Sequence, residues 1–191
     1  MVYYIDDDLL ALDLPQALAG MSPQRRDYLL RYRHEAGRRA GAAAYLLLCQ
    51  GLRECYGITE PPTFAFGPHG KPYLPEHPDI HFSLSHCREA AACAVSAHPI
   101  GIDIESVRSF SPELLSHTMH PTEQEQIRND PEPQIAFLRL WTRKEAAFKM
   151  QGTGITDALC DILLISPHLH FSTIVSPDKR YVYSVCSDRP I

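Results

Sequence analysis

Residues 100–105 read Ile100-Gly101-Ile102-Asp103-Ile104-Glu105. An apolar side chain stands at every second position of this stretch, which is the period of a β-strand. Successive side chains of a strand point to opposite faces, so the three isoleucines share one face and Gly101, Asp103 and Glu105 share the other. We expect the isoleucine face to be buried in the core. The two carboxylates then stand side by side on the opposite face.

The paired carboxylates have two interpretations. Neighbouring anions on one face repel each other, and a hard cation such as Mg²⁺, which takes oxygen ligands and keeps positions for water and phosphate, would relieve that repulsion. The alternative is an ordinary amphipathic strand whose acidic face is solvated. The stretch alone does not decide between a metal site and a solvated face.

The segments around this strand predict the fold class. Two strand-like runs precede it closely, at residues 81–85 and 91–96, and the close spacing predicts an antiparallel meander of the three. Elsewhere we expect helices at 35–53 and from 131 to about 151, the second ended by Gly152, and strands at 2–5, 162–165, 168–175 and 181–186. Strands cluster after helices in each half of the chain, which predicts an α+β protein of two similar lobes.

Composition excludes several classes of protein. The chain has 191 residues, 45% of them apolar, with 18 Lys and Arg against 23 Asp and Glu, a net charge of −5. These values are typical of a globular protein, and the negative charge argues against sequence-independent binding to nucleic acid. The longest nearly unbroken apolar run, residues 40–49, is half the length of about 20 residues that a membrane span requires. Residues 1–8 do not resemble a secretory signal, so we expect a cytoplasmic protein.

Two residue types are distributed informatively. The six cysteines have irregular spacings and no Cys-x-x-Cys pair, so we expect reduced thiols rather than disulfides or a zinc site. Six of the 18 cations fall within fifteen residues: Arg25, Arg26, Arg31, Arg33, Arg38 and Arg39. A local basic cluster in an acidic protein indicates a small phosphorylated ligand.

A second candidate site follows at residues 141–149. On a helix, Trp141, Glu145 and Lys149 lie at i, i+4 and i+8, so one face carries an aromatic ring, an acid and a base in succession. The same spacing also suits an ordinary surface ion pair between Glu145 and Lys149, which would stabilise the helix by a few tenths of a kcal/mol.

Two short motifs lie between the basic cluster and the acidic strand. Gly70-Lys71-Pro72 is not a Walker loop, because Pro72 occupies the place of the Ser or Thr that follows the lysine. In Phe82-Ser83-Leu84-Ser85-His86, the neighbours Ser85 and His86 point in different directions on a strand and make a poor nucleophile and base. They are better suited to hydrogen bonds with a phosphate.

The four motifs follow one another along the chain at residues 70–72, 82–86, 101–105 and 141–149. Taken together in that order, they resemble those of the 4′-phosphopantetheinyl transferases, of the type that activates surfactin synthetase. The resemblance runs from about residue 22 to residue 154. It implies transfer of the phosphopantetheine arm of coenzyme A to a serine of an apo acyl, peptidyl or aryl carrier protein, with release of adenosine 3′,5′-bisphosphate. It also implies a pseudo-dimeric α+β fold with an N-terminal lobe at 1–106, a C-terminal lobe at 107–191 and coenzyme A between them.

The resemblance assigns roles to individual residues. Asp103, Glu105 and Glu145 are the implied ligands of Mg²⁺, for which Mn²⁺ could substitute. Glu145, or a metal-bound water beside it, is the implied base for the carrier serine. Lys149 is similar to the family's lysine beside the pyrophosphate of coenzyme A, where it would stabilise the leaving phosphate. The implied contacts to coenzyme A are Arg25, Arg39, Lys71, Pro72, Ser85, His86 and Lys144.

The carrier protein is the implied macromolecular partner. Its contact region corresponds to Ser109 to Ile127, where Phe110, Leu114, Leu115 and Met119 could form an exposed apolar stripe or half of a core. We expect a monomer with no nucleic acid or membrane partner. Two other functions remain open: a metal-dependent phosphodiesterase with the same three carboxylates, and a non-catalytic homologue that only binds carrier proteins.

Overall fold

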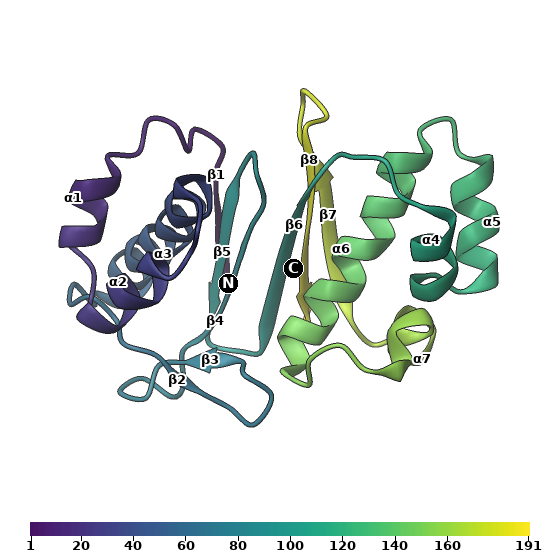
Figure 1. Cartoon of the computed structure of the whole chain (residues 1–191). Helices are drawn as coiled ribbons and strands as arrows, with labels where there is room; N and C mark the ends of the chain where they lie inside the picture. The colour runs from purple at the N-terminus through teal and green to yellow at the C-terminus, as the bar shows by residue number, and fades with distance from the viewer.

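The computed structural model describes all 191 residues. Two three-stranded antiparallel sheets stand next to each other in the middle of the molecule, and helices cover their outer sides (Figure 1). The helices on the first sheet come from the N-terminal half of the chain and those on the second from the C-terminal half. The predicted α+β fold is confirmed. None of the helices is both long and apolar enough to cross a membrane.

The first sheet has the order β1-β5-β4. Its strands are β1 (Val2–Asp6), β4 (His81–His86) and β5 (Ala91–Ser96), and the elements around it are α1 (Leu14–Ala19), α2 (Pro23–Leu30), α3 (Glu35–Tyr56) and the short hairpin of β2 (Ala65–Phe66) and β3 (Pro72–Tyr73). The long helix α3 packs on the apolar side chains of β4 and β5 to form the largest core cluster. Gly57, in the left-handed conformation at φ 69°, ends this helix.

The second sheet has the order β6-β8-β7. Its strands are β6 (Ile100–Ser106), β7 (His170–Val175) and β8 (Tyr181–Ser187), and its helices are α4 (Pro112–Thr118), α5 (Pro121–Asn129), α6 (Pro133–Gln151) and α7 (Ile162–Ile165), with a 3-10 turn at Asp157–Cys160. Gly152 ends α6 at φ 72°, as the sequence predicts.

The isoleucine face of β6 is buried between the two sheets. Ile100, Ile102 and Ile104 are each no more than 1% exposed. They pack with Ala92 and Ala94 of β5 and with Ala90, which directly precedes that strand. The small alanine side chains leave room for the larger isoleucines opposite them. The alternating stretch therefore joins the two halves of the molecule.

The opposite face of β6 packs directly on α6. At Gly101 a Cβ atom would lie 1.9 Å from the carbonyl oxygen of Ala146 and 2.6 Å from the amide nitrogen of Met150. Backbone atoms of a packed helix cannot move aside cheaply, so only glycine allows this approach.

Replacing Gly101 with alanine is expected to lower the free energy of unfolding by about 2–3 kcal/mol, because α6 must shift away from β6. Urea denaturation measures the loss. Gly20→Ala is the matched control, since a Cβ there meets nothing closer than 3.8 Å. Equal stability of the two variants would show that α6 is not held against β6 at this point.

Two sequence-based expectations for the strands are wrong. Strands β4 and β5 pair as predicted, but β6 is hydrogen-bonded to β8 and not to β5, so there is no three-stranded meander. Residues 162–165 form the short helix α7 rather than a strand.

The lobe boundary after residue 106 stays a prediction. The pairing of β6 with β8 favours a boundary before residue 100, because it places β6 in the C-terminal sheet.

Candidate functional site

The centre of the site is a three-way contact between β4, β6 and α6. The ammonium of Lys149 donates to Asp103 Oδ1 at 2.6 Å and to the hydroxyl of Ser85 at 2.9 Å. That hydroxyl in turn donates to the same Asp103 oxygen, also at 2.9 Å. One predicted residue from each of three motifs therefore meets at a single point.

The three predicted carboxylates influence each other. The pKa of Glu145 is raised to about 7, chiefly by burial and then by the nearby charge of Asp103; Lys149 opposes this rise and Glu105 adds to it. Burial and Asp103 likewise raise the pKa of Glu105, whose carboxylate accepts a hydrogen bond from Trp141 Nε1 at 3.4 Å. Like charges brought together out of water favour the protonated acid, which is the cause of both shifts.

This donor set fits a hard cation. Asp103 is only 3% exposed, and its Oδ2 atom is buried without a hydrogen-bond partner. An unpartnered carboxylate oxygen beside two acids with raised pKa values is an arrangement that a divalent cation would stabilise. Nowhere in the chain do three or more His, Cys, Asp or Glu side chains already stand close enough to hold a metal together.

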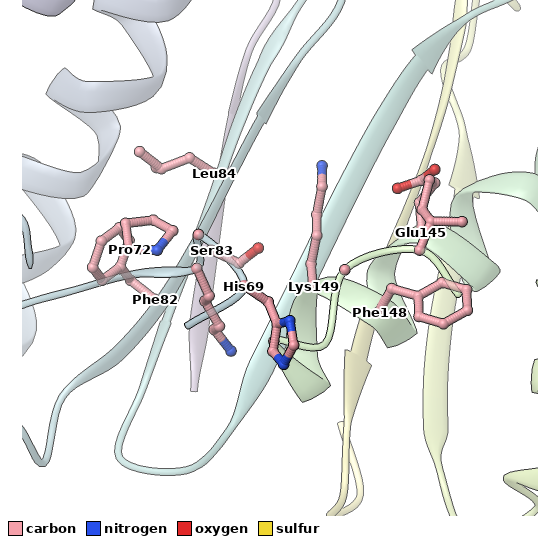
Figure 2. A pocket seen from close by; sticks show the side chains of 13 residues that line it. His69, Pro72, Phe82, Ser83, Leu84, Glu145, Phe148 and Lys149 are labelled. Carbon is pink, nitrogen blue, oxygen red and sulfur yellow. The ribbon is translucent and has the colours of Figure 1, made fainter. Parts of the chain in front are cut away.

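A cavity of about 260 Å³ opens beside these groups (Figure 2). Glu145, Phe148 and Lys149 line its α6 side, and Phe82 and Ser83 line its β4 side. The loop before β3 and the first residue of that strand close it with four further residues, His69, Gly70, Lys71 and Pro72.

Lys71 connects that loop to the C-terminal end of α6, the helix that carries Glu145 and Lys149. Its ammonium donates to the carbonyl of Met150 at 2.7 Å, and burial lowers its pKa. A Cβ at Gly152 would lie 2.8 Å from Lys71 Cδ, so the glycine that ends the helix also makes room for the lysine. Lys71 is thereby held at the wall of the cavity.

A positively charged region continues from Lys149 toward the arginine cluster. Burial lowers the pKa of His86, and the charges of Lys149 and Arg25 lower it further. His86 and Arg25 both approach Gly41 of α3: a Cβ atom added at Gly41 would lie 3.8 Å from His86 Nε2 and 3.9 Å from Arg25 Nη2. The Nε of Arg25 is buried without a partner. Arg25, His86 and Lys149 thus form one region suited to anions.

Two residues predicted to contact coenzyme A, Lys144 and Arg39, do not line this cavity. Lys144 is completely buried on another side of α6, where its ammonium pairs with Glu123 at 2.6 Å and donates to three backbone carbonyls: Thr118, Leu159 and Cys160. Arg39 pairs with Glu35 at 2.7 Å and donates to the carbonyl of Leu12.

Two polar residues that line the cavity, Ser83 and His69, were not among the predicted site residues. A signal for Ser83 exists, because serines at i and i+2 of a strand point to the same face, so Ser83 accompanies Ser85 toward β6. No comparable signal marks His69, which lies in an irregular loop.

Comparisons with known proteins identify the family of the chain. The sequence model described as the 4′-phosphopantetheinyl transferase superfamily matches residues 99–188. A 4′-phosphopantetheinyl transferase of Bacillus subtilis is 29% identical over 98% of this chain and 91% of its own length, and the transferase Sfp of Bacillus subtilis (strain 168) is 28% identical over 96% and 82%. The transferase AcpT of Salmonella typhimurium is 32% identical over 75% of this chain and 69% of its own. The chain therefore belongs to the 4′-phosphopantetheinyl transferase superfamily and is a transferase.

Proposed function

We propose that the chain transfers the phosphopantetheine arm of coenzyme A to an apo carrier protein. The carrier serine oxygen forms a bond to the phosphorus that carries pantetheine, and the bond from that phosphorus to adenosine 3′,5′-bisphosphate breaks. The serine proton passes to a base on the enzyme. The observation that carries this proposal is the contact of Asp103 and Ser85 with Lys149, which lines a cavity together with Glu145.

Asp103, Glu105 and Glu145 would hold Mg²⁺, or Mn²⁺ in its place. A bound divalent cation supplies positive charge at the phosphate oxygens, which phosphoryl transfer requires. The unpartnered Asp103 oxygen and the raised pKa values of the two glutamates support this set of ligands.

The protein's own side chains position the substrate and move the proton. Glu145, with a pKa raised to about 7, is suited to accept a proton from the carrier serine near neutral pH. The ammonium of Lys149 neutralises charge that develops on the leaving phosphate. Arg25, His86 and Lys71 would bind the other phosphates of coenzyme A. Arg39 would have to leave Glu35 to join them, and Lys144 has no role at the cavity.

The carrier contact region proposed at residues 109–127 contains α4 and all but the last two residues of α5. Of its apolar residues, Leu115 and Met119 are buried in the core beneath α6, at 3% and 1% exposure, whereas Leu114 is 39% exposed. Phe110 stacks on Phe137 with ring centroids 4.6 Å apart. The core interpretation is therefore correct for Leu115 and Met119, and we propose Leu114 as the apolar contact for the carrier.

Intact-protein mass spectrometry tests the proposed function. Apo carrier proteins from fatty acid, polyketide and nonribosomal peptide synthesis are incubated with the chain, coenzyme A and Mg²⁺. At least one carrier is expected to gain the mass of one phosphopantetheine group, and EDTA is expected to prevent the gain.

The same experiment separates the two alternatives. A phosphodiesterase would release free phosphopantetheine and leave every carrier unmodified. A non-catalytic homologue would bind coenzyme A or carrier without forming either product. Either result would contradict the transfer reaction proposed here.

A further inference from the structure

Strand β6 has a backbone partner on one side only. Its other edge faces β4, and there the amides of Ile102 and Ile104 donate to the hydroxyls of Ser83 and Ser85 at 3.1 and 3.3 Å. Both serines are buried. A buried amide without a partner costs free energy, so the two hydroxyls take the place of a missing hydrogen-bond ladder between the sheets.

The two hydroxyls differ in how much capacity they have left. A serine hydroxyl has one proton to donate and two lone pairs that accept. Ser85 uses all three, because it donates to Asp103 and accepts from Ile104 and Lys149. Ser83 accepts from Ile102 alone, and its proton is donated to no atom of the chain.

The free proton of Ser83 belongs to a residue that lines the cavity together with Lys149, Lys71 and Glu145. In Figure 2 the oxygen of Ser83 points from β4 toward the side of the cavity where Lys149 stands. Because the amide of Ile102 occupies one lone pair, the hydroxyl cannot turn its proton toward β6. The ammonium groups of Lys149 and Lys71, which line the same cavity, favour an anionic oxygen as the acceptor.

We propose that Ser83 is a substrate-binding residue whose hydroxyl donates a hydrogen bond to a pyrophosphate oxygen of coenzyme A. Ser85, which the motif makes the first candidate for this contact, instead holds Asp103 and Lys149 in place. The inference rests on the proposed function, since coenzyme A is the substrate of that reaction.

Ser83→Ala tests the contact, and Ser96→Ala is its matched control. Ser96 is a buried serine of the adjacent strand β5 whose hydroxyl also accepts one backbone amide, that of His98 at 3.1 Å. Ser96 does not line the cavity. The two substitutions therefore remove the same kind of structural hydrogen bond, and only the first removes a donor to the substrate.

Three quantities are measured for the wild-type chain and both variants: the Kd of coenzyme A by titration calorimetry, the KM of coenzyme A, and the Mg²⁺ concentration that gives half-maximal activity. Ser83→Ala is expected to raise Kd and KM about 10- to 100-fold, the loss typical of one hydrogen bond to a charged group. Its Mg²⁺ requirement is expected to stay within about twofold, and Ser96→Ala to match the wild type in all three.

Two outcomes would overturn the proposal. Unchanged Kd and KM in Ser83→Ala would limit Ser83 to the contact with Ile102. A raised Mg²⁺ requirement that accounts for the whole loss would show that Ser83 acts through the position of Asp103 and does not touch the substrate. Failure of the proposed function gives a different result, since the wild-type chain itself would then modify no carrier.

Discussion

Glu145→Gln is expected to lower kcat/KM for carrier modification by about 10²- to 10⁴-fold, the range found when a catalytic acid or base is removed. The amide has nearly the same shape as the carboxyl group but carries no charge and cannot accept the serine proton. It also leaves Asp103 and Glu105 with one charge fewer for a divalent cation. Carrier modification followed by mass spectrometry at fixed Mg²⁺ measures the loss.

The same substitution is expected to stabilise the fold in EDTA. The pKa of Glu145 is raised to about 7 in the folded chain, chiefly by burial and by Asp103, and an unfolded chain restores the ordinary value near 4.5. Above pH 7 the ionised side chain therefore opposes folding, whereas below pH 4.5 it does not. At pH 8 in EDTA the variant is expected to gain about 1 kcal/mol, a value reduced from the full shift because the side chain is only half-buried.

Glu76→Gln is the matched control for both measurements, because it makes the same change at an exposed loop position. It is expected to alter neither activity nor stability. If Glu145→Gln kept near-full activity, its roles as metal ligand and base would be wrong. If Glu145→Gln lost stability in EDTA as well as activity, the loss of activity would be assigned to disturbed packing rather than to the missing charge.

The fold could be predicted as far as local periodicity reaches. The alternation of residues 100–105 correctly gives a strand with a buried isoleucine face, and Gly152 correctly ends the second long helix. Periodicity does not name the partner of a strand, however. Strand β6 pairs with β8, about eighty residues later, although β5 is three residues away. The four apolar residues 162–165 are too short a run to distinguish helix from strand.

The site could be predicted where the motifs converge, and Lys144 shows where motif reasoning failed. At 100° per residue, Glu145 and Lys149 lie about 40° apart around α6 and face the same cavity. Lys144 lies about 140° from Lys149, so both cannot reach one phosphate group. Helix geometry applied to the sequence would have separated them. The partner of Lys144, Glu123, could not be found this way, because the chain between them folds back through α5.

Lys144→Ala is expected to lower the free energy of unfolding by about 3–5 kcal/mol, the cost of leaving a buried charge without its partner. The ammonium is 0% exposed and holds the Glu123 carboxylate and the carbonyls at the end of α4 and in the 3-10 turn. Glu123 also accepts from the amide of His120 at the start of α5. One lysine therefore ties three segments to the helix that carries Glu145 and Lys149.

Urea denaturation of a set of variants distinguishes this buried pair from an ordinary ion pair. Lys179→Ala removes an exposed pair, with Glu132, of nearly the same length, 2.7 Å, and is expected to cost less than about 1 kcal/mol. The double variant Lys144→Met/Glu123→Leu is expected to recover part of the stability lost in Lys144→Ala, because it leaves no uncompensated charge behind. Equal losses for Lys144→Ala and Lys179→Ala would contradict the burial of this charge. A double variant less stable than Lys144→Ala would instead assign the effect to packing volume.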